Sequence, residues 1–173
     1  VVGAGCVGAG AIGGTIAARL DAAGHDVTVT ARGDNLAAIR DRGLRIKGGF
    51  GAHTAAVTAL EALAEPPDVA ILAVKATGAV AALEANRNAL EGIPLLVVQN
   101  GLGGERAAAR LLGHERVAGG LSLMAANSLE PGIVTVTATG DTIVGGAEGA
   151  RFAALLRDAL PTSETPSIEG AQW

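Results

Sequence analysis

The chain opens with Val1-Val2-Gly3-Ala4-Gly5-Cys6-Val7-Gly8-Ala9-Gly10-Ala11-Ile12-Gly13-Gly14, and its 173 residues are organised around this stretch. An apolar run passes into closely spaced glycines and then into TIAARL at residues 15–20, which predicts a strand, a tight turn and the start of a helix. Glycines let the backbone approach a pyrophosphate closely, and a helix N-terminus offers free N–H groups and a partial positive charge. The stretch therefore indicates a dinucleotide site.

The motif GxGxxG occurs twice here, at residues 3–8 and at residues 8–13. The first register leaves two residues for the strand and places Gly10, Gly13 and Gly14 in the helix, where each glycine costs roughly 1 kcal/mol relative to alanine. The second register keeps residues 1–7 as the strand and starts the helix near Gly13, so we predict that it forms the phosphate turn. The predicted pyrophosphate-binding residues are Gly8, Ala9, Gly10, Ala11, Ile12 and Gly13.

The composition favours one domain whose core is built from small and aliphatic side chains. Hydrophobic residues make up 49% of the chain and aromatic residues only 2%, so Ala, Val, Leu and Ile must fill the core. The net charge of −4 and the absence of a basic run argue against nucleic acid as a partner.

The single cysteine and the hydropathy pattern point to a cytoplasmic protein. Cys6 has no second cysteine to pair with and lies in the predicted first strand, which favours a buried apolar role over a reactive thiol. No apolar run is long enough to span a membrane, and no export signal opens the chain. Because the chain starts at Val1 and not at Met, we expect a few leading residues to be missing.

A βαβ unit follows the glycine turn. Residues 14–23 read as a helix ended by Gly24, and the β-branched run at residues 27–30 predicts the second strand. Arg32 follows Gly13 by 19 positions, where dinucleotide-binding proteins usually carry an acidic residue for the ribose 2′-hydroxyl. An arginine there favours the 2′-phosphate of NADP. A solvated loop arginine, with Asp34 approaching the ribose, is the alternative.

The rest of the chain predicts an α/β fold of the Rossmann type, doubly wound, with a mostly parallel sheet and an antiparallel extension near the C-terminus. Predicted strands are residues 68–74, 94–98, 117–126, 133–136 and 142–144, with the last three forming the antiparallel part. Predicted helices are residues 35–42 with Asp34 as a cap, 78–90, 105–112 and 150–160. Residues 44–47 and 54–58 read as a hairpin, and residues 162–166 as a loop.

Two polar residues follow predicted parallel strands directly. Lys75 comes after the apolar strand of residues 68–74, and Asn100 comes two residues after the strand of residues 94–98. Ligands of open α/β sheets bind at the carboxyl ends of strands, so both side chains are candidates to face a cofactor or a keto acid. An ordinary exposed lysine and an Asn-Gly turn are the alternatives. His25, His53 and His114 have no ligand cluster around them, and we predict no metal site.

Four segments together resemble the ketopantoate reductase (2-dehydropantoate 2-reductase) family: the glycine turn with Arg32, AVKA at residues 73–76, VQNGLG at residues 98–103 and IEGAQW at residues 168–173. The resemblance covers essentially the whole chain and implies that residues 1–166 are that family's N-terminal NADP-binding Rossmann domain. Residues 167–173 then begin the connection to a helical substrate domain that is absent from this chain.

The resemblance also implies roles for individual residues. Residues 8–13 hold the pyrophosphate, Arg32 holds the 2′-phosphate, and Lys75 and Asn100 face the nicotinamide and the substrate. Ala126, or Ala125 if the alignment shifts by one, lies beside the cofactor. Two departures stand out: Gly78 occupies a position where the family often has glutamine, and the family's catalytic lysine comes two positions after the tryptophan that Trp173 resembles.

The implied activity is the NADPH-dependent reduction of 2-dehydropantoate (ketopantoate) to pantoate in pantothenate biosynthesis, with this chain supplying the NADP(H)-binding half. The expected partner is a small 2-keto acid, and a homodimer is left open. The 173-residue chain is expected to bind NADPH with negligible turnover. Two other functions remain open from the sequence: a related reductase of another 2-keto acid, and a non-catalytic NAD(P)-sensing module.

Overall fold

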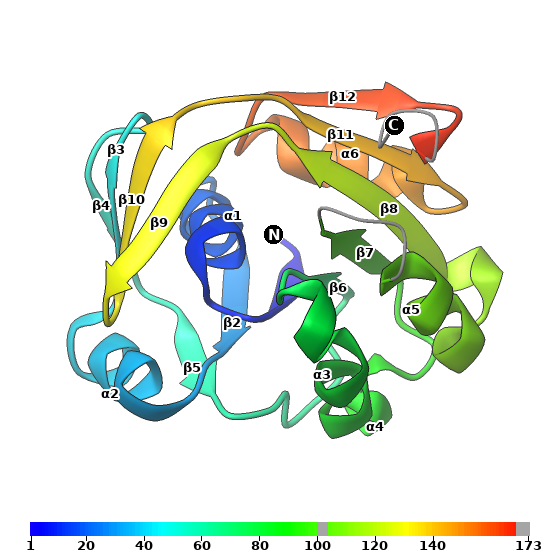
Figure 1. Cartoon of the computed structure of the whole chain (residues 1–173), viewed down its shortest axis with the longest axis horizontal. Helices are drawn as coiled ribbons and strands as arrows, with labels where there is room; N and C mark the ends of the chain where they lie inside the picture. The colour runs from blue at the N-terminus through cyan, green and yellow to red at the C-terminus, as the bar shows by residue number, and fades with distance from the viewer. Residues whose placement is uncertain (100–103, 169–173) are drawn as a thin grey trace.

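The structure is a computed structural model that describes residues 1–99 and 104–168. Its main sheet has eight strands in the order β12-β11-β8-β7-β6-β1-β2-β5 (Figure 1). The strands are β1 (Gly3–Val7), β2 (Asp26–Thr30), β5 (Thr58–Leu60), β6 (Val69–Leu72), β7 (Leu95–Val98), β8 (Val117–Ser122), β11 (Thr142–Gly146) and β12 (Thr162–Thr165). All neighbouring pairs are parallel except β8 with β11. The Rossmann-type fold predicted from the sequence is confirmed.

Helices cover both faces of this sheet. They are α1 (Ala11–Ala22), α2 (Gly33–Arg42), α3 (Ala79–Ala85), α4 (Arg87–Leu90), α5 (Gly104–Leu112) and α6 (Gly149–Arg157), with 3-10 turns η1 (Ala76–Gly78) and η2 (His114–Arg116). One apolar cluster joins α1 and α6 to one face of the sheet, and a second cluster joins α3, α4 and α5 to the other face. Continuous apolar strands such as β6 and β7 are buried on both sides, as parallel strands in this class require.

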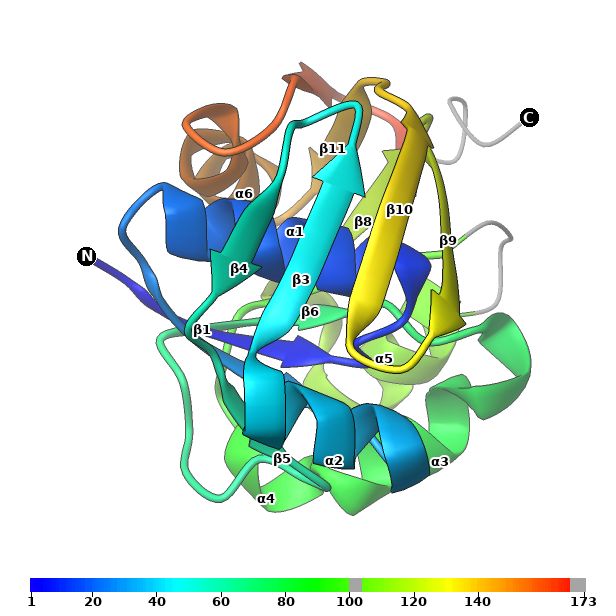
Figure 2. The ribbon, with the colours of Figure 1, turned by 90° about the vertical axis from the view of Figure 1, so that its left-hand side faces the viewer.

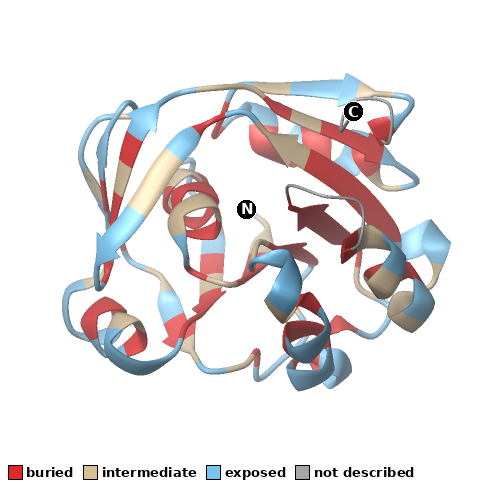
Figure 3. Cartoon of the chain, viewed as in Figure 1, coloured by how far each residue is buried: buried red, intermediate tan, exposed pale blue. Residues whose placement is uncertain are grey.

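A second sheet of four strands lies over α1. Its order is β4-β3-β10-β9, with bounds β3 (Leu44–Gly48), β4 (His53–Ala55), β9 (Ala125–Glu130) and β10 (Ile133–Ala138). Leu44, Ile46, Val134 and Val136 belong to the same apolar cluster as α1. Figure 2 shows α1 between the two sheets, and Figure 3 shows buried central strands with exposed edges at β9 and β12.

The first helix starts earlier than predicted, because α1 begins at Ala11 and contains Gly13 and Gly14. A Cβ on Gly13 would collide with the Gly8 carbonyl oxygen, and a Cβ on Gly14 would lie 2.8 Å from Val134 Cγ2. The close approach of α1 to the turn and to the second sheet therefore requires glycine at both positions, despite its low helix propensity.

The prediction of one strand over residues 117–126 is wrong. β8 ends at Ser122 and β9 begins at Ala125, because the chain passes from the main sheet to the second sheet between them. The turn at Pro131-Gly132 joins β9 to β10 as predicted, and the hairpin of β3 and β4 is confirmed, although residue 58 starts β5 of the main sheet.

The loop predicted at residues 162–166 is also wrong, since Thr162–Thr165 form edge strand β12 beside β11. The predicted helix of residues 78–90 is divided at Asn86, whose side chain accepts from the Leu63 N–H at 2.8 Å and donates to the Ala82 carbonyl at 2.7 Å. Asp34 is not the cap of α2: the N-cap is Arg32, and no side chain caps that helix end.

Cys6 is a buried apolar residue of β1, as predicted, and we expect it to be chemically inert in the folded chain. It is fully buried, and this burial raises the pKa of its thiol to about 12. At pH 8 only about one thiol in ten thousand is then ionised, and the thiolate is the reactive form. Ellman's reagent should therefore label denatured chain rapidly and native chain hardly at all. Complete labelling of native chain on the same timescale would contradict this expectation.

Candidate functional site

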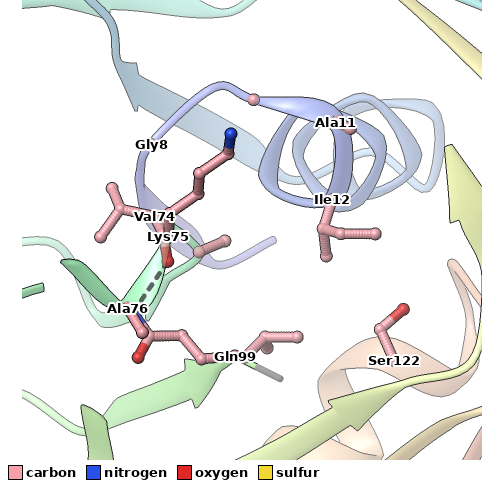
Figure 4. Close-up of a pocket in the computed structure, with 11 residues that line it drawn as sticks. Gly8, Ala11, Ile12, Val74, Lys75, Ala76, Gln99 and Ser122 are labelled. Atoms are coloured by element: carbon pink, nitrogen blue, oxygen red, sulfur yellow. Dashed lines mark hydrogen bonds between the residues drawn. The ribbon is translucent and has the colours of Figure 1, made fainter. Parts of the chain in front are cut away.

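A hollow of about 570 Å³ lies where the strands β1, β6, β7 and β8 end (Figure 4). Its lining comes from the glycine turn, the start of α1, the segment after β6 and the ends of β7 and β8. The lining residues are Gly8, Gly10, Ala11, Ile12, Ala73, Val74, Lys75, Ala76, Val98, Gln99 and Ser122. Open α/β sheets bind ligands at this edge.

The glycine turn occupies residues 8–10, since β1 ends at Val7 and α1 begins at Ala11. The GxGxxG register at residues 8–13 therefore matches the strand, turn and helix. Gly8 has φ +103°, and a Cβ there would lie 2.6 Å from Val74 Cγ1, so only glycine fits. Thr30 fixes the turn from β2: its Oγ1 accepts from the Gly8 N–H at 3.0 Å, and its carbonyl accepts from the Ala9 N–H at 2.9 Å.

The N–H groups of Gly10, Ala11, Ile12 and Gly13 are the donors left free at the start of α1. Within residues 1–99 and 104–168, none of them has a hydrogen-bond acceptor. A Cβ atom added to Gly10 would have no neighbouring atom within 4 Å. The positive end of α1 therefore faces open space with free donors, which is the arrangement that binds a pyrophosphate.

A second hollow of about 300 Å³ adjoins the first and shares Gly8, Gly10 and Val74 with it. It is lined by Val7, Gly8, Ala9, Gly10, Thr30, Ala31, Arg32, Asn35, Glu61, Val74, Gly78, Ala82 and Asn86. Arg32 is exposed at the start of α2, and its side chain makes no hydrogen bond or ion pair with any residue that the structure describes. Its guanidinium is thus available to an anionic group at this end of the site.

Lys75 lies in the first hollow, as its position after β6 predicts. The side chain is exposed and extends on the side of the glycine turn (Figure 4). It has no hydrogen bond or ion pair to a described residue, so the ammonium group is free to contact a ligand. Gly78 lines the second hollow without contributing a side chain.

Two polar residues of the first hollow were not predicted as site residues. Gln99 is only 6% exposed, its Nε2 donates to the Val74 carbonyl at 2.8 Å, and its Oε1 has no hydrogen-bond partner among the described residues. In the same part of the chain, Ser122 Oγ at the end of β8 is also buried without a partner. The position of Gln99 beside Asn100 in the quoted segment was the available signal, whereas nothing in the sequence distinguished Ser122.

The remaining predicted site residues either lie outside the described residues or line neither hollow. Asn100 lies outside the described residues, as does Trp173. Ala126 is half-buried in β9 against the core and lines neither hollow, and Ala125 is exposed. Among the described residues no cluster of His, Cys, Asp and Glu could hold a metal. No helix in that part of the chain is long and apolar enough to cross a membrane.

Comparison with known proteins gives a consistent set of relatives. The sequence model of the family "Ketopantoate reductase PanE/ApbA" matches residues 5–149. The 2-dehydropantoate 2-reductase of Pyrococcus horikoshii is 35% identical over 141 residues, covering 80% of this chain and 46% of the relative. That of Archaeoglobus fulgidus is 34% identical over 176 residues, covering 96% of this chain and 57% of the relative. The chain thus spans about half the length of these curated relatives.

Solved structures agree on the fold. The 2-dehydropantoate 2-reductase of Geobacter metallireducens GS-15 is 32% identical with a TM-score of 0.91, and the match covers 98% of this chain and 60% of that one. A D-mandelate dehydrogenase with NADH and anilino(oxo)acetate has a TM-score of 0.85 over 98% of this chain and 58% of its own, at 20% identity. The latter likeness concerns the fold alone.

Proposed function

This chain belongs to the ketopantoate reductase PanE/ApbA family, and on that premise we propose that it is the NADPH-binding part of an enzyme that reduces 2-dehydropantoate to pantoate. The observation that carries the proposal is the start of α1, where free N–H groups lie beside a hollow at the carboxyl ends of parallel strands. A small 2-keto acid as substrate and a cytoplasmic location belong to the same proposal.

The described residues fit a dinucleotide. The N–H groups of Gly10, Ala11 and Ile12 suit the pyrophosphate, and the open space at Gly10 leaves room for it. Arg32 at the far end suits a 2′-phosphate, with which a guanidinium can form two parallel hydrogen bonds. The unpartnered Gln99 Oε1 and Ser122 Oγ are buried polar atoms at the end that a nicotinamide would occupy. We assign residues 1–166 to this cofactor-binding role.

In the proposed reaction the cofactor supplies the hydride, and the residues of this chain bind and orient the cofactor and the substrate. When bound, NADPH supplies the hydride that reduces the ketone carbon of the substrate. Lys75 at the end of β6 holds the cofactor and a substrate carboxylate through its ammonium charge, and Asn100 orients the substrate. The family resemblance implies a lysine as the proton donor to the ketone oxygen, and we assign binding and orientation to Lys75 and Asn100.

The proposal is tested by separating cofactor binding from turnover in the 173-residue chain. We expect NADPH fluorescence to change saturably on titration, and we expect negligible loss of NADPH absorbance when ketopantoate is then added. A chain unfolded in urea serves as the control for non-specific binding. Absence of binding by the folded chain would overturn the proposal, and rapid reduction of ketopantoate by this chain alone would overturn the division of roles.

A further inference from the structure

Asn35 uses both ends of its side-chain amide. It lies in the first turn of α2, where its Nδ2 donates to the Ala9 carbonyl at 3.0 Å and its Oδ1 accepts from the Gly132 N–H at 2.8 Å. A backbone carbonyl can only accept and a backbone N–H can only donate, so these partners determine the orientation of the amide. The two bonds use one of the two Nδ2 hydrogens and one of the two Oδ1 lone pairs, and they tie the side chain to two backbone segments.

These two bonds connect three segments that are distant in sequence. Ala9 belongs to the glycine turn, Asn35 belongs to the helix that begins after Arg32, and Gly132 lies in the turn between β9 and β10. Gly132 has φ +75°, and a Cβ there would lie 3.1 Å from the Ala38 Cβ, so the second sheet packs closely against α2. The start of α2 is thus held both to the glycine turn and to the second sheet.

NADPH carries a pyrophosphate and a 2′-phosphate, and its binding therefore depends on the separation between the glycine turn and Arg32. The pyrophosphate and the 2′-phosphate are attached to one adenosine ribose, so their separation is limited by covalent structure. Their proposed donors, the start of α1 and Arg32, belong to different helices. The protein must hold these helices at a matching separation before binding, because ordering them afterwards would reduce the affinity.

We propose that Asn35 is a positioning residue for NADPH preference: it fixes Arg32 relative to the glycine turn and so favours NADPH over NADH. This inference rests on the proposed function, because it needs a dinucleotide in the site. Asn35 acts through Arg32 and the Ala9 carbonyl, and it lines the same hollow as the guanidinium.

Two substitutions of Asn35 distinguish the loss of its hydrogen bonds from the effect of a new negative charge at that position. In Asn35→Ala both hydrogen bonds are lost. In Asn35→Asp one oxygen still accepts from Gly132, but the other faces the Ala9 carbonyl, and two acceptors repel. The new carboxylate also competes with a 2′-phosphate for Arg32. We expect the ratio of the NADH to the NADPH dissociation constant to fall about three- to tenfold in Asn35→Ala and about tenfold or more in Asn35→Asp.

The test measures these dissociation constants by fluorescence titration of the 173-residue chain, with thermal unfolding as a check on folding. Asn88→Ala, at an exposed position of α4, is the matched control and should leave the ratio unchanged. In an Arg32→Ala background, Asn35→Ala should produce no further fall in the ratio, because the group through which it acts is gone.

The outcomes distinguish this inference from the proposed function. If the wild-type chain binds neither cofactor, the proposed function fails. If it binds NADPH preferentially and both Asn35 variants weaken NADPH and NADH by the same factor, Asn35 is only a structural contact and the inference is wrong. An undiminished effect of Asn35→Ala in the Arg32→Ala background would also overturn it.

Discussion

Replacing Arg32 with alanine is expected to remove most of the preference of the chain for NADPH over NADH. The guanidinium is exposed at the start of α2, lines the hollow next to the glycine turn and is not engaged by another described residue. Hydrogen bonds to a charged group contribute about 1.5–3 kcal/mol, so the NADPH dissociation constant should rise about 10- to 150-fold. NADH lacks the 2′-phosphate, and its dissociation constant should hardly change.

Titrations of both cofactors into three variants measure this effect. Arg32→Lys keeps the charge but loses the planar fork, so it should retain part of the preference. Arg87→Ala, at an exposed position of α4, controls for the general loss of one positive charge. An unchanged NADPH-to-NADH ratio in Arg32→Ala would remove Arg32 from the site and would favour the interpretation of a solvated loop arginine.

Gly13→Ala should mainly lower the stability of the fold, whereas Gly10→Ala should mainly weaken NADPH binding. A Cβ on Gly13 would collide with the Gly8 backbone, and such overpacking costs about 1–3 kcal/mol of unfolding free energy. A Cβ on Gly10 meets no atom within 4 Å and its backbone φ of −82° suits alanine, so the fold should tolerate it. That methyl group would instead occupy the space proposed for the pyrophosphate.

Urea unfolding and NADPH titration of the two variants test this contrast. Gly13→Ala should lower the unfolding midpoint clearly, whereas Gly10→Ala should keep it near the wild-type value and weaken NADPH binding about tenfold or more. Gly149→Ala in α6 is the control: it lines neither hollow, its φ is not positive, and a Cβ there also meets no atom within 4 Å. Wild-type affinity in Gly10→Ala would contradict the placement of the pyrophosphate at this turn.

The central strands could be predicted from the sequence because their burial appears as continuous apolar runs. β6 and β7 are buried on both faces, and the β-branched β2 pairs with β1 in parallel. The start of α1 was predicted too late, since propensity disfavours glycine in a helix while the close approach of Gly13 to Gly8 requires it. Edge strand β12 was missed because its polar residues, TSET, carry no apolar alternation.

The candidate site was predictable where sequence spacing controls position. The glycine turn follows β1 directly and Lys75 follows the end of β6 by three residues, so the sheet itself brings them to one edge. The contacts of Asn35 were not predictable, because its hydrogen-bond partners lie 26 and 97 positions away in the sequence. A single polar residue near the start of a helix can also cap the helix or face solvent. The same holds for Thr30, whose hydroxyl fixes Gly8 only once β1 and β2 are paired.

We propose that the free N–H groups at the start of α1 and the Arg32 guanidinium together bind NADPH. The most direct measurement is calorimetric titration of the wild-type 173-residue chain with NADPH and, separately, with NADH. We expect one saturable site per chain for each cofactor, with NADPH bound at least about tenfold more tightly because of its 2′-phosphate. Equal affinities, or no binding of NADPH by the folded chain, would contradict it.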